Sequence, residues 1–555
     1  MKKIFLFSII LCVAMAATLS ATGQGDMSAT TPDVLSFSLY QPQMGTINMW
    51  DTFVGKEWVK AMEEYLGVTL DIENREIPWR GGYLDKRDIY LASGDFADVM
   101  LVLPTSDEYQ IFEIGDAGLV IDLYDYKEYT PYYDKLLDQN FGRLRGESPE
   151  GKMYAFWIGS FGTGEGTGGT QAYWAYRKDT FDDLGIAFPE DLNDVYEAAK
   201  KMKAAFPKSY PVGGYGGTGF GMNYTTALFQ LNKTRQTVYF NGDKFVFGPV
   251  DDKERFKATL EYLNKMYEDG LMDPEWLSNT RDQHRAKMVN GTSHMSLMLY
   301  LWEVNDANKN SEFGGQWVVP KLPKNLYGEL GWKFNSGAPI DGGIGTFAGV
   351  TISTKAEHPE LLAKMVDYQY SDEMMTLITW GVEGETFSYN SDGKAVFSEE
   401  IASITDPDEN QAKLQSLGLW TGSTRGGIHF AATNHHIGVV VDDSVSPSWD
   451  GKTVIQESYG TFTGRINGGF DSAFPEDEGY VPPIRVSTED KETIANVMTP
   501  IETFLTESIA KFIVGDIPIS DYDKFLKDID KYGDWKKVVD IKNAALAVAK
   551  QKMGM

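Results

Sequence analysis

The sequence predicts an α/β fold made of two lobes that are joined by a hinge. Strand and helix patterns alternate along two long blocks of the chain, which is typical of sheets covered by helices. Two glycine-rich stretches, residues 159–169 and 342–349, separate these blocks at distant points. The 555 residues are long enough for two domains with large cores. A chain that crosses between two lobes more than once forms a hinged pair with a cleft between them.

The N-terminus has the layout of a secretory signal peptide. Lys2 and Lys3 precede an apolar run over residues 4–17, and small residues follow at Ala21 and Gly23. The run is shorter than the roughly 20 residues of a membrane-spanning helix. We expect cleavage after residue 23, so that residues 1–23 are removed and residues 24–33 form a flexible tether. The mature protein is then expected to be soluble and periplasmic, or otherwise extracytoplasmic.

The single cysteine and the charge exclude several classes of function. Cys12 lies within the apolar run and follows Ile9, Ile10 and Leu11, so we expect no lipid anchor. The mature chain would have no cysteine for disulfides or thiol catalysis. A net charge of −29 disfavours nucleic acid as a partner, because phosphate binding needs a basic surface. The 13 Trp and 29 Tyr favour a surface that stacks on flat or ring-shaped ligands.

The first block predicts an open sheet with parallel strands. Strand patterns alternate with helical spacing in the order strand, helix, strand, helix, strand over residues 34–40, 53–66, 68–72, 85–93 and 98–103. The last of these is a continuous apolar run, as expected for a strand covered on both faces.

The second block begins after the first glycine-rich stretch. It predicts strands at residues 171–176 and 295–301, with helices at 178–185, 192–206, 256–269 and 282–290. After the second glycine-rich stretch, helices are expected at residues 359–370 and 371–380, an irregular region at 385–490, and helices at 501–513, 519–532 and 535–550.

Six short segments, in this order, resemble one known family. The segments are Tyr90–Met100 (YLASGDFADVM), Gly118–Leu123 (GLVIDL), Gly151–Phe156 (GKMYAF), Tyr176–Ile186 (YRKDTFDDLGI), Met266–Glu275 (MYEDGLMDPE) and Gly381–Tyr389 (GVEGETFSY). Together they cover most of the mature chain and resemble the extracellular solute-binding proteins of family 1. The subgroup is the oligosaccharide-binder-like group of ABC transporter substrate-binding proteins.

The resemblance implies a periplasmic-binding-protein type II clamp, with a hinge and a cleft between its lobes. Lobe one is expected at residues 34–160 plus 346–490, and lobe two at 170–344 plus 491–555. The hinge crossings are expected at 161–169 and 345–350. The resemblance implies that such a protein binds a carbohydrate, and an oligosaccharide in particular, between its lobes. Because the solute contacts both lobes, it shifts the population toward the closed state.

The implied partners are the small-molecule solute and the transmembrane subunits of an ABC permease, with the binding protein a monomer and not an enzyme. Two other functions stay open at this point. One is a secreted glycan-active enzyme, either a glycoside hydrolase or a lyase. The other is a binding protein that feeds a sensor kinase.

Candidate ligand-binding residues are aromatic and polar side chains in loops at strand ends, where open α/β sheets bind ligands. Flat rings would stack on sugar faces, and polar groups would bond to hydroxyls. The resemblance places a stacking aromatic at Trp302. The candidates are Asn48, Trp50, Asp51, Trp79, Trp157, Tyr215, Phe220, Trp302, Glu303 and Trp380.

No cofactor, catalytic residue or metal site is expected. Of the six histidines only His435 and His436 are close in sequence, and adjacent residues point apart on regular elements. Some relatives carry a calcium loop after the helix that ends here at Phe206. Residues 207–211 (PKSYP) lack the alternating Asp and Asn oxygens that such a loop needs.

Overall fold

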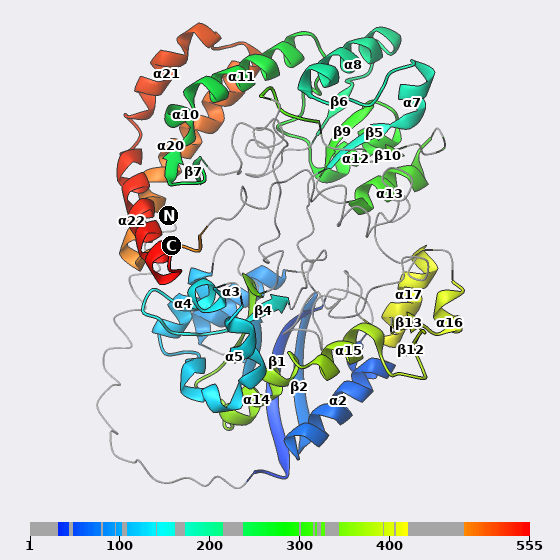
Figure 1. The fold of residues 1–555 in the computed structure, drawn as a ribbon, viewed down its shortest axis with the longest axis vertical. Coiled ribbons are helices and arrows are strands. Elements are labelled where there is room, and N and C mark those ends of the chain that lie inside the picture. Colours follow the sequence, from blue (N-terminus) through cyan, green and yellow to red (C-terminus); the bar gives the residue numbers. More distant parts are fainter. Residues whose placement is uncertain are drawn as a thin grey trace.

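The structure is a computed structural model of the chain. It describes residues 31–43, 48–78, 82–94, 96–102, 108–139, 141–160, 173–214, 237–298, 301–312, 314, 317–318, 323–327, 343–391, 393, 395–404, 407–419 and 482–555. These residues form two α/β bodies, drawn one above the other in Figure 1. The expected signal peptide and nearly all of the tether lie outside the described residues. None of the described helices has the length and apolar character that crossing a membrane requires.

Lobe one, the lower body in Figure 1, is built on a five-stranded sheet with the order β2-β1-β3-β11-β4. Its strands are β1 (Val34–Gln43), β2 (Thr69–Pro78), β3 (Val99–Val102), β4 (Phe156–Ser160) and β11 (Gly343–Ile352). β1 is parallel to β2 and β3, as predicted. β11 runs antiparallel to both β3 and β4. The second glycine-rich stretch is therefore a strand within the sheet, which the sequence pattern did not indicate.

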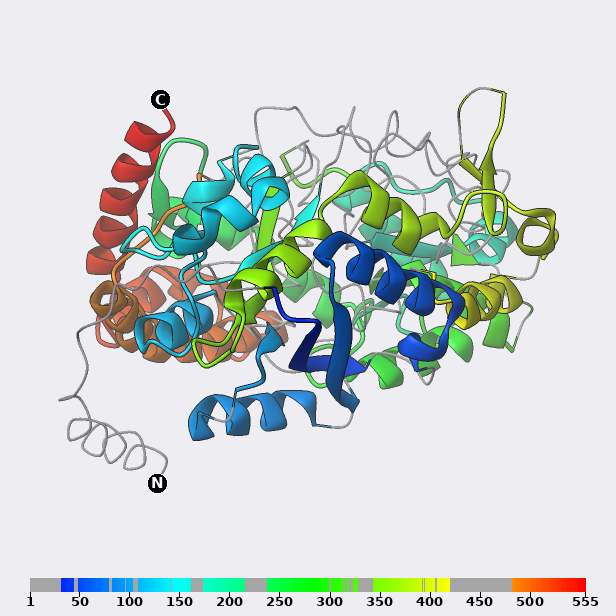
Figure 2. The same cartoon turned by 90° about the horizontal axis from the view of Figure 1, so that it is seen from below.

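Helices cover both faces of this sheet and bury one continuous core from Leu35 to Leu419. In Figures 1 and 2, α2, α14 and α15 lie side by side, and α3 lies apart from them across the strands. The helices are η1 (Met49–Asp51), α2 (Phe53–Leu66), α3 (Tyr83–Ser93), α4 (Tyr109–Asp116), η3 (Leu123–Tyr129), α5 (Pro131–Leu137), α6 (Gly142–Gly146), α14 (Pro359–Tyr368) and α15 (Asp372–Trp380).

The region expected to be irregular begins with regular structure. A hairpin of β12 (Phe387–Tyr389) and β13 (Ala395–Phe397) is followed by α16 (Glu399–Ala402) and α17 (Pro407–Leu417). The expectation was wrong for these residues because short elements between glycines leave little periodic signal. Residues 420–481 lie outside the described part of the chain.

Lobe two has a smaller sheet with the order β10-β5-β9-β6 and a separate β7-β8 hairpin. Its strands are β5 (Tyr173–Arg177), β6 (Val212–Gly213), β7 (Val238–Phe240), β8 (Phe245–Phe247), β9 (Met295–Met298) and β10 (Trp317–Val318). Its helices are α7 (Lys178–Asp183), α8 (Leu192–Ala205), α10 (Gly248–Asp251), α11 (Lys253–Glu268), α12 (Arg281–Val289), α13 (Leu301–Asn310), α20 (Thr488–Val514), η6 (Ile519–Asp521), α21 (Tyr522–Ile529) and α22 (Trp535–Lys552). A second core draws residues from β5 to β9, from α7, α8 and α11, and from the C-terminal helices α20, α21 and α22.

Two expectations for lobe two are corrected. The strand expected at 295–301 ends at Met298, and α13 begins at Leu301. The C-terminal helix begins at Thr488 rather than near 501, and it continues through Pro500. The Ser487 hydroxyl accepts the N–H of Asp490 and caps this longer helix. Proline removes one helical hydrogen bond, but packing of the α20 face against α11 maintains the helix on both sides of it.

The core residues show that the chain changes lobe three times. The changes fall between Trp157 and Trp174, between Leu326 and Ile344, and between Leu419 and Met498. β4 precedes the first change of lobe and β11 follows the second. These two strands pair directly, with Gly343 opposite Ser160. In the third connection between the lobes, Ile484 packs against the core of lobe two, whereas Val486 packs against the core of lobe one.

Arg485 fastens the third connection to lobe one. Its guanidinium forms an ion pair with Glu108 at 2.7 Å and donates to the Glu147 carbonyl at 3.0 Å. Next to it, the Tyr109 hydroxyl donates to the Val486 carbonyl at 2.8 Å, and the Val486 N–H donates back to that hydroxyl. The Arg485 and Glu108 side chains are mostly buried, at 14% and 20% exposure, so this pair is shielded from solvent.

We predict that Arg485→Ala lowers the free energy of unfolding by about 2 kcal/mol, because Glu108 would lose its charged partner in a shielded position. Chemical denaturation would measure this. The control is Lys60→Ala, which removes an exposed pair with Glu57 and should cost at most about 0.5 kcal/mol. Equal effects of the two substitutions would show that the Arg485 contacts do not stabilise the connection.

Candidate functional site

The carboxyl ends of β1 and β2 point toward lobe two in Figure 1. In an open α/β sheet, ligands bind where such strand ends meet loops. The loop residues 44–47, 79–81 and 103–107 lie outside the described part of the chain, and Trp79 is among them. The described residues at these strand ends therefore form the frame of the candidate site.

Buried polar side chains lie near these strand ends on both faces of the sheet. The Gln41 amide is completely buried and donates to Asn74 Oδ1 at 3.0 Å. Arg87, on α3, is 1% exposed, and its guanidinium donates twice to Asp88. Burial raises the pKa of the nearby Tyr40 phenol, although the Arg87 charge opposes this shift. Sequence reasoning missed Gln41 and Arg87, because the pattern shows α3 as a helix without indicating that its arginine points inward.

The turn after β1 brings three of the predicted site residues together. The Asn48 amide donates to Asp51 Oδ2 at 2.7 Å, and Asn48 Oδ1 accepts the N–H of Trp50. The Trp50 ring packs edge-on against Trp58, at 5.5 Å between ring centres. Its indole N–H is buried and has no hydrogen-bond partner among the described residues. Because Thr52 then caps α2 through the N–H of Gly55, the turn is held in one conformation.

Trp157 is a core residue of lobe one, which corrects its expected place at a ligand surface. Its side chain is completely buried, and its indole N–H donates to the Gly146 carbonyl at 2.9 Å. A Cβ atom on Gly146 would lie 2.7 Å from the indole, and one on Gly349 would lie 3.1 Å from it. These two glycines therefore leave the space that the indole fills.

Trp380 is also buried, at 4% exposure, in a small cluster with Phe387 and Phe397. It ends α15, and Gly381 follows with φ 86°, ψ −136°, a conformation open mainly to glycine. A Cβ atom on Gly381 would lie 2.1 Å from the Thr386 hydroxyl, which donates to the Trp380 carbonyl. The structure thus places Trp380 in the core of the hairpin region.

The predicted site residues of lobe two are only partly described. Trp302 and Glu303 lie in the first turn of α13 instead of following a strand. Tyr215 and Phe220 lie outside the described residues. Gly214, which directly precedes Tyr215, is described and lies at the end of β6.

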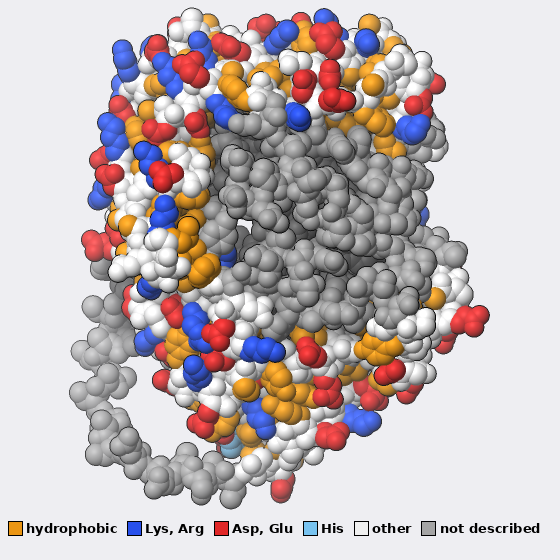
Figure 3. Space-filling view, viewed as in Figure 1, with side chains coloured by type: hydrophobic (Ala, Val, Ile, Leu, Met, Phe, Trp, Pro, Cys, Tyr) orange, Lys and Arg blue, Asp and Glu red, His pale blue; other side chains and the backbone are white. Residues whose placement is uncertain are grey.

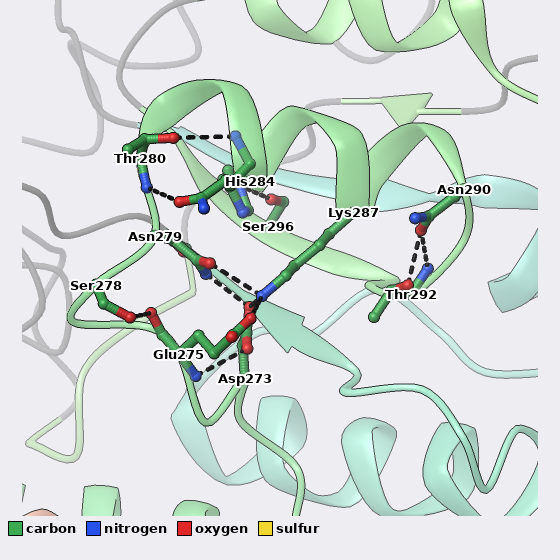
Figure 4. A network of polar contacts seen from close by, with 12 residues as sticks. Asp273, Glu275, Ser278, Asn279, Thr280, His284, Lys287, Asn290, Thr292 and Ser296 are labelled. Atoms are coloured by element: carbon green, nitrogen blue, oxygen red, sulfur yellow. Dashed lines mark hydrogen bonds and ion pairs between the residues drawn. The ribbon is translucent and has the colours of Figure 1, made fainter.

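A network of charged and polar side chains is centred on the buried Asp273 (Figure 4). Asp273 is 1% exposed and accepts from Lys287 at 2.8 Å and from Asn279 at 2.7 Å. The same Asn279 amide donates to the Gly214 carbonyl at 3.1 Å. Burial disfavours the ammonium of Lys287, but its hydrogen bonds to Asp273 and Glu275 outweigh this and raise its pKa. The network fixes the point from which the chain leaves β6.

Comparison with known proteins decides the family. The model of the family described as bacterial extracellular solute-binding protein matches residues 53–376. This chain is a bacterial extracellular solute-binding protein. Its extracytoplasmic place, and its role as a binding protein rather than an enzyme, follow from this membership. The resemblance drawn from the sequence segments is thereby confirmed.

Similar proteins match over nearly the whole chain. The fructooligosaccharide ABC transporter substrate-binding protein FusA of Streptococcus pneumoniae is 22% identical over 96% of both chains. A solved FusA structure in complex with fructo-nystose has a TM-score of 0.63, with 18% identity, and the match covers 94% of this chain and 99% of that one. A solute-binding protein of Bifidobacterium longum infantis, described as binding HMO, has a TM-score of 0.66 and 16% identity over 92% and 98%. These likenesses confirm the predicted two-lobe α/β fold.

Two histidines are buried within lobe two of this solute-binding protein. His284 contacts the Ser296 hydroxyl at 2.6 Å, and His294 contacts Thr180 at 3.1 Å. Burial lowers the pKa of both imidazoles to about 4, so both are neutral near pH 7. His435 and His436 lie outside the described residues. Within the described ranges, no group of three or more His, Cys, Asp or Glu side chains is arranged to hold a metal ion.

We predict that the stability contributed at His284 falls as the pH is lowered from about 6.5 to 4. In this window the unfolded chain binds a proton at His284 and the folded chain does not, so acid favours unfolding. The pKa difference corresponds to about 3 kcal/mol at most. The free-energy difference between the unaltered protein and His284→Gln should therefore shrink between pH 7 and pH 4.5.

The control is Gln283→Ala in the same helix. It removes a capping contact with Thr280 but no titrating group, so its cost should be the same at both pH values. Denaturant unfolding measures both variants. A His284→Gln difference that stays constant with pH would contradict the prediction.

Proposed function

We propose that this protein is the solute-binding component of an ABC importer, and that it binds a carbohydrate, most suitably an oligosaccharide, between its lobes. The observation that carries the proposal is the match along 96% of both chains to a fructooligosaccharide ABC transporter substrate-binding protein. The secreted, acidic, aromatic-rich composition agrees with this role. The protein would deliver its solute to the transmembrane subunits of a permease.

We propose that the turn over residues 48–51 forms the lobe-one part of the sugar site. The Trp50 ring supplies an apolar face, and its indole N–H is a donor without a partner among the described residues. The Asp51 carboxylate is exposed and accepts hydrogen bonds from hydroxyls. On lobe two, Trp302 stacking and Glu303 hydrogen bonding stay predictions, as do the contacts of Trp79, Tyr215 and Phe220. Trp157 and Trp380 are left out because both are buried in cores.

Closure would use the places where the chain changes lobe. We propose lobe one at residues 34–160 plus 343–419 and lobe two at 173–327 plus 488–555. The boundary expected at 344–346 is corrected, because Ile344 lies in the core of lobe one. The first hinge crossing lies between β4 and β5, and the second lies between Leu326 and Ile344. The crossing expected at 345–350 is wrong, because these residues belong to β11 within the sheet of lobe one. Residues 482–487 add a third connection. A solute that contacts both lobes binds the closed form better and shifts the population toward it. We also propose cleavage after residue 23 and a monomer free in the periplasm.

The experiment is a thermal-shift screen of the mature protein against neutral and acidic oligosaccharides, with kestose and nystose included. A ligand that binds only the folded state adds about 2.7 kcal/mol to the free energy of unfolding at a concentration of 100 Kd. The melting temperature therefore rises. Calorimetric titration then gives the affinity of each hit. Amino acids and short peptides serve as controls, and a shift with those alone would overturn the assignment to carbohydrate.

We predict that Trp50→Ala lowers affinity for the best carbohydrate about tenfold, through loss of one stacking contact worth about 1.4 kcal/mol. Its melting temperature should change little, because the ring is only partly buried. The control, Trp157→Ala, should lose about 3–5 kcal/mol of stability, as expected for a core tryptophan. Calorimetric titration and thermal melting separate the two cases. Unchanged affinity in Trp50→Ala would remove this turn from the site.

A further inference from the structure

The charge of the chain bears on which carbohydrates it can bind. Asp and Glu number 80 and Lys and Arg 51, so the net charge is −29. Within residues 420–481, which lie outside the described part of the chain, Asp and Glu again outnumber Lys and Arg. A negative potential repels an anionic solute at long range unless cations at the site oppose it. The charged side chains close to the proposed site therefore determine whether it accepts an anion.

Two arginines near the strand ends of lobe one already have carboxylate partners. Arginine is the side chain best suited to a sugar carboxylate, because its guanidinium can donate two parallel hydrogen bonds. Arg75, on β2, forms an ion pair with Glu73 at 2.9 Å. The buried Arg87, on α3, forms one with Asp88 at 2.6 Å. A solute carboxylate would have to compete with a carboxylate of the protein for either guanidinium.

The turn over residues 48–51 presents a negative charge. The Asp51 side chain is exposed, and its Oδ2 atom accepts a hydrogen bond from the uncharged Asn48 amide at 2.7 Å. In the part of the chain that the structure describes, Asp51 has no ion-pair partner. Trp50, directly before it, supplies the ring proposed to pack on the sugar. A sugar unit on that ring would therefore lie next to a carboxylate that no cation neutralises.

We infer that Asp51 makes the protein selective for uncharged oligosaccharides, because its carboxylate accepts hydrogen bonds from hydroxyls and repels sugars that carry a carboxylate. The inference rests on the proposed carbohydrate-binding function and names the class of carbohydrate within it. A hydroxyl donates to a carboxylate in a short, charge-assisted hydrogen bond. A sugar acid in the same place would bring two like charges together, and such repulsion is how binding sites exclude wrong partners.

Calorimetric titration of the mature protein tests the preference for an uncharged ligand. The ligands are kestose, the tightest-binding neutral oligosaccharide of the thermal-shift screen, and trigalacturonate, which has a carboxylate on each unit. We expect the best neutral ligand to bind at least about 100-fold more tightly than trigalacturonate. Its Kd should stay the same when NaCl is raised from about 50 to about 500 mM, because salt screens contacts between charges.

Substitutions at Asp51 test the role of its charge through the ratio of the two affinities. Asp51→Asn removes the charge but keeps the size and an accepting oxygen. The ratio should narrow about tenfold, through weaker binding of the neutral ligand and tighter binding of trigalacturonate. Asp51→Glu keeps the charge and should keep the ratio within about threefold.

The matched control is Asp125→Asn, which removes an exposed carboxylate by the same substitution in η3. η3 follows Ile121, whose N–H donates to the Ile352 carbonyl, and Ile352 pairs with Val99 at the amino end of β3. This is the end of the sheet opposite to the proposed site. The affinity ratio of Asp125→Asn should therefore equal that of the unaltered protein.

Binding of trigalacturonate as tight as that of the best neutral ligand would overturn the inference and leave the proposed function intact. A ratio that does not change in Asp51→Asn would also overturn it, as would trigalacturonate binding that stays undetectable in that variant. An unaltered protein that binds no carbohydrate would overturn both. Narrowing in Asp51→Asn alone would support the inference. Misfolding of a variant would lower the binding stoichiometry for both ligands and leave their ratio unchanged.

Discussion

The end of lobe one nearest lobe two depends on the packing of one tryptophan. The Trp157 N–H donates to the Tyr133 hydroxyl, its carbonyl accepts from the Tyr370 hydroxyl, and its indole bonds to Gly146. β4, β11, α5, α6 and the residues after α14 therefore meet at this residue. Glycines at positions 146 and 349 are required because larger residues would occupy the space of the indole. The connections to lobe two thus begin from a rigid base.

This rigid base separates solute binding from the movement of the lobes. The turn over residues 48–51 belongs to lobe one and is fixed by its own contacts. On lobe two, the buried charges of Asp273 and Lys287 fix the end of β6 in the same way. Buried charges are costly unless paired, so the network is stable only when complete. If solute binds at these two places as proposed, both parts of the site are preorganised, and lobe movement is the main conformational change expected on binding.

The sequence predicted much of the fold and less of the site. The helix expected at 53–66 has these bounds in the structure, and the first three strands are parallel as expected. Periodicity succeeds there because each element has one buried face over several turns or residue pairs. It fails at β11, because its glycines indicate both a flexible crossing and a close approach to Trp157. Only the packing in three dimensions separates these meanings.

The site was harder to predict because residue type does not show burial. A tryptophan at a strand end serves equally well as a stacking surface or as core, and the structure places Trp50 at a turn but Trp157 inside. Gln41 was missed because a buried amide at the end of a strand leaves no periodic signal, and Arg87 was missed because its inward orientation depends on how α3 meets the sheet.

Closure adds a constraint on how tightly such a protein can hold its solute. A solute binds the closed form more tightly only through the contacts it makes with the second lobe. To change the ratio of closed to open molecules from 1:99 to 99:1, the preference of the solute for the closed form must reach about 10⁴-fold, or about 5.5 kcal/mol. One aromatic contact on lobe two is worth a fraction of that, so several groups there must act together. Contacts on lobe one add affinity in both states and do not drive closure. Under the proposed function, Trp50 would therefore help to set how tightly the open form captures a sugar, whereas the contacts on lobe two determine whether the clamp closes.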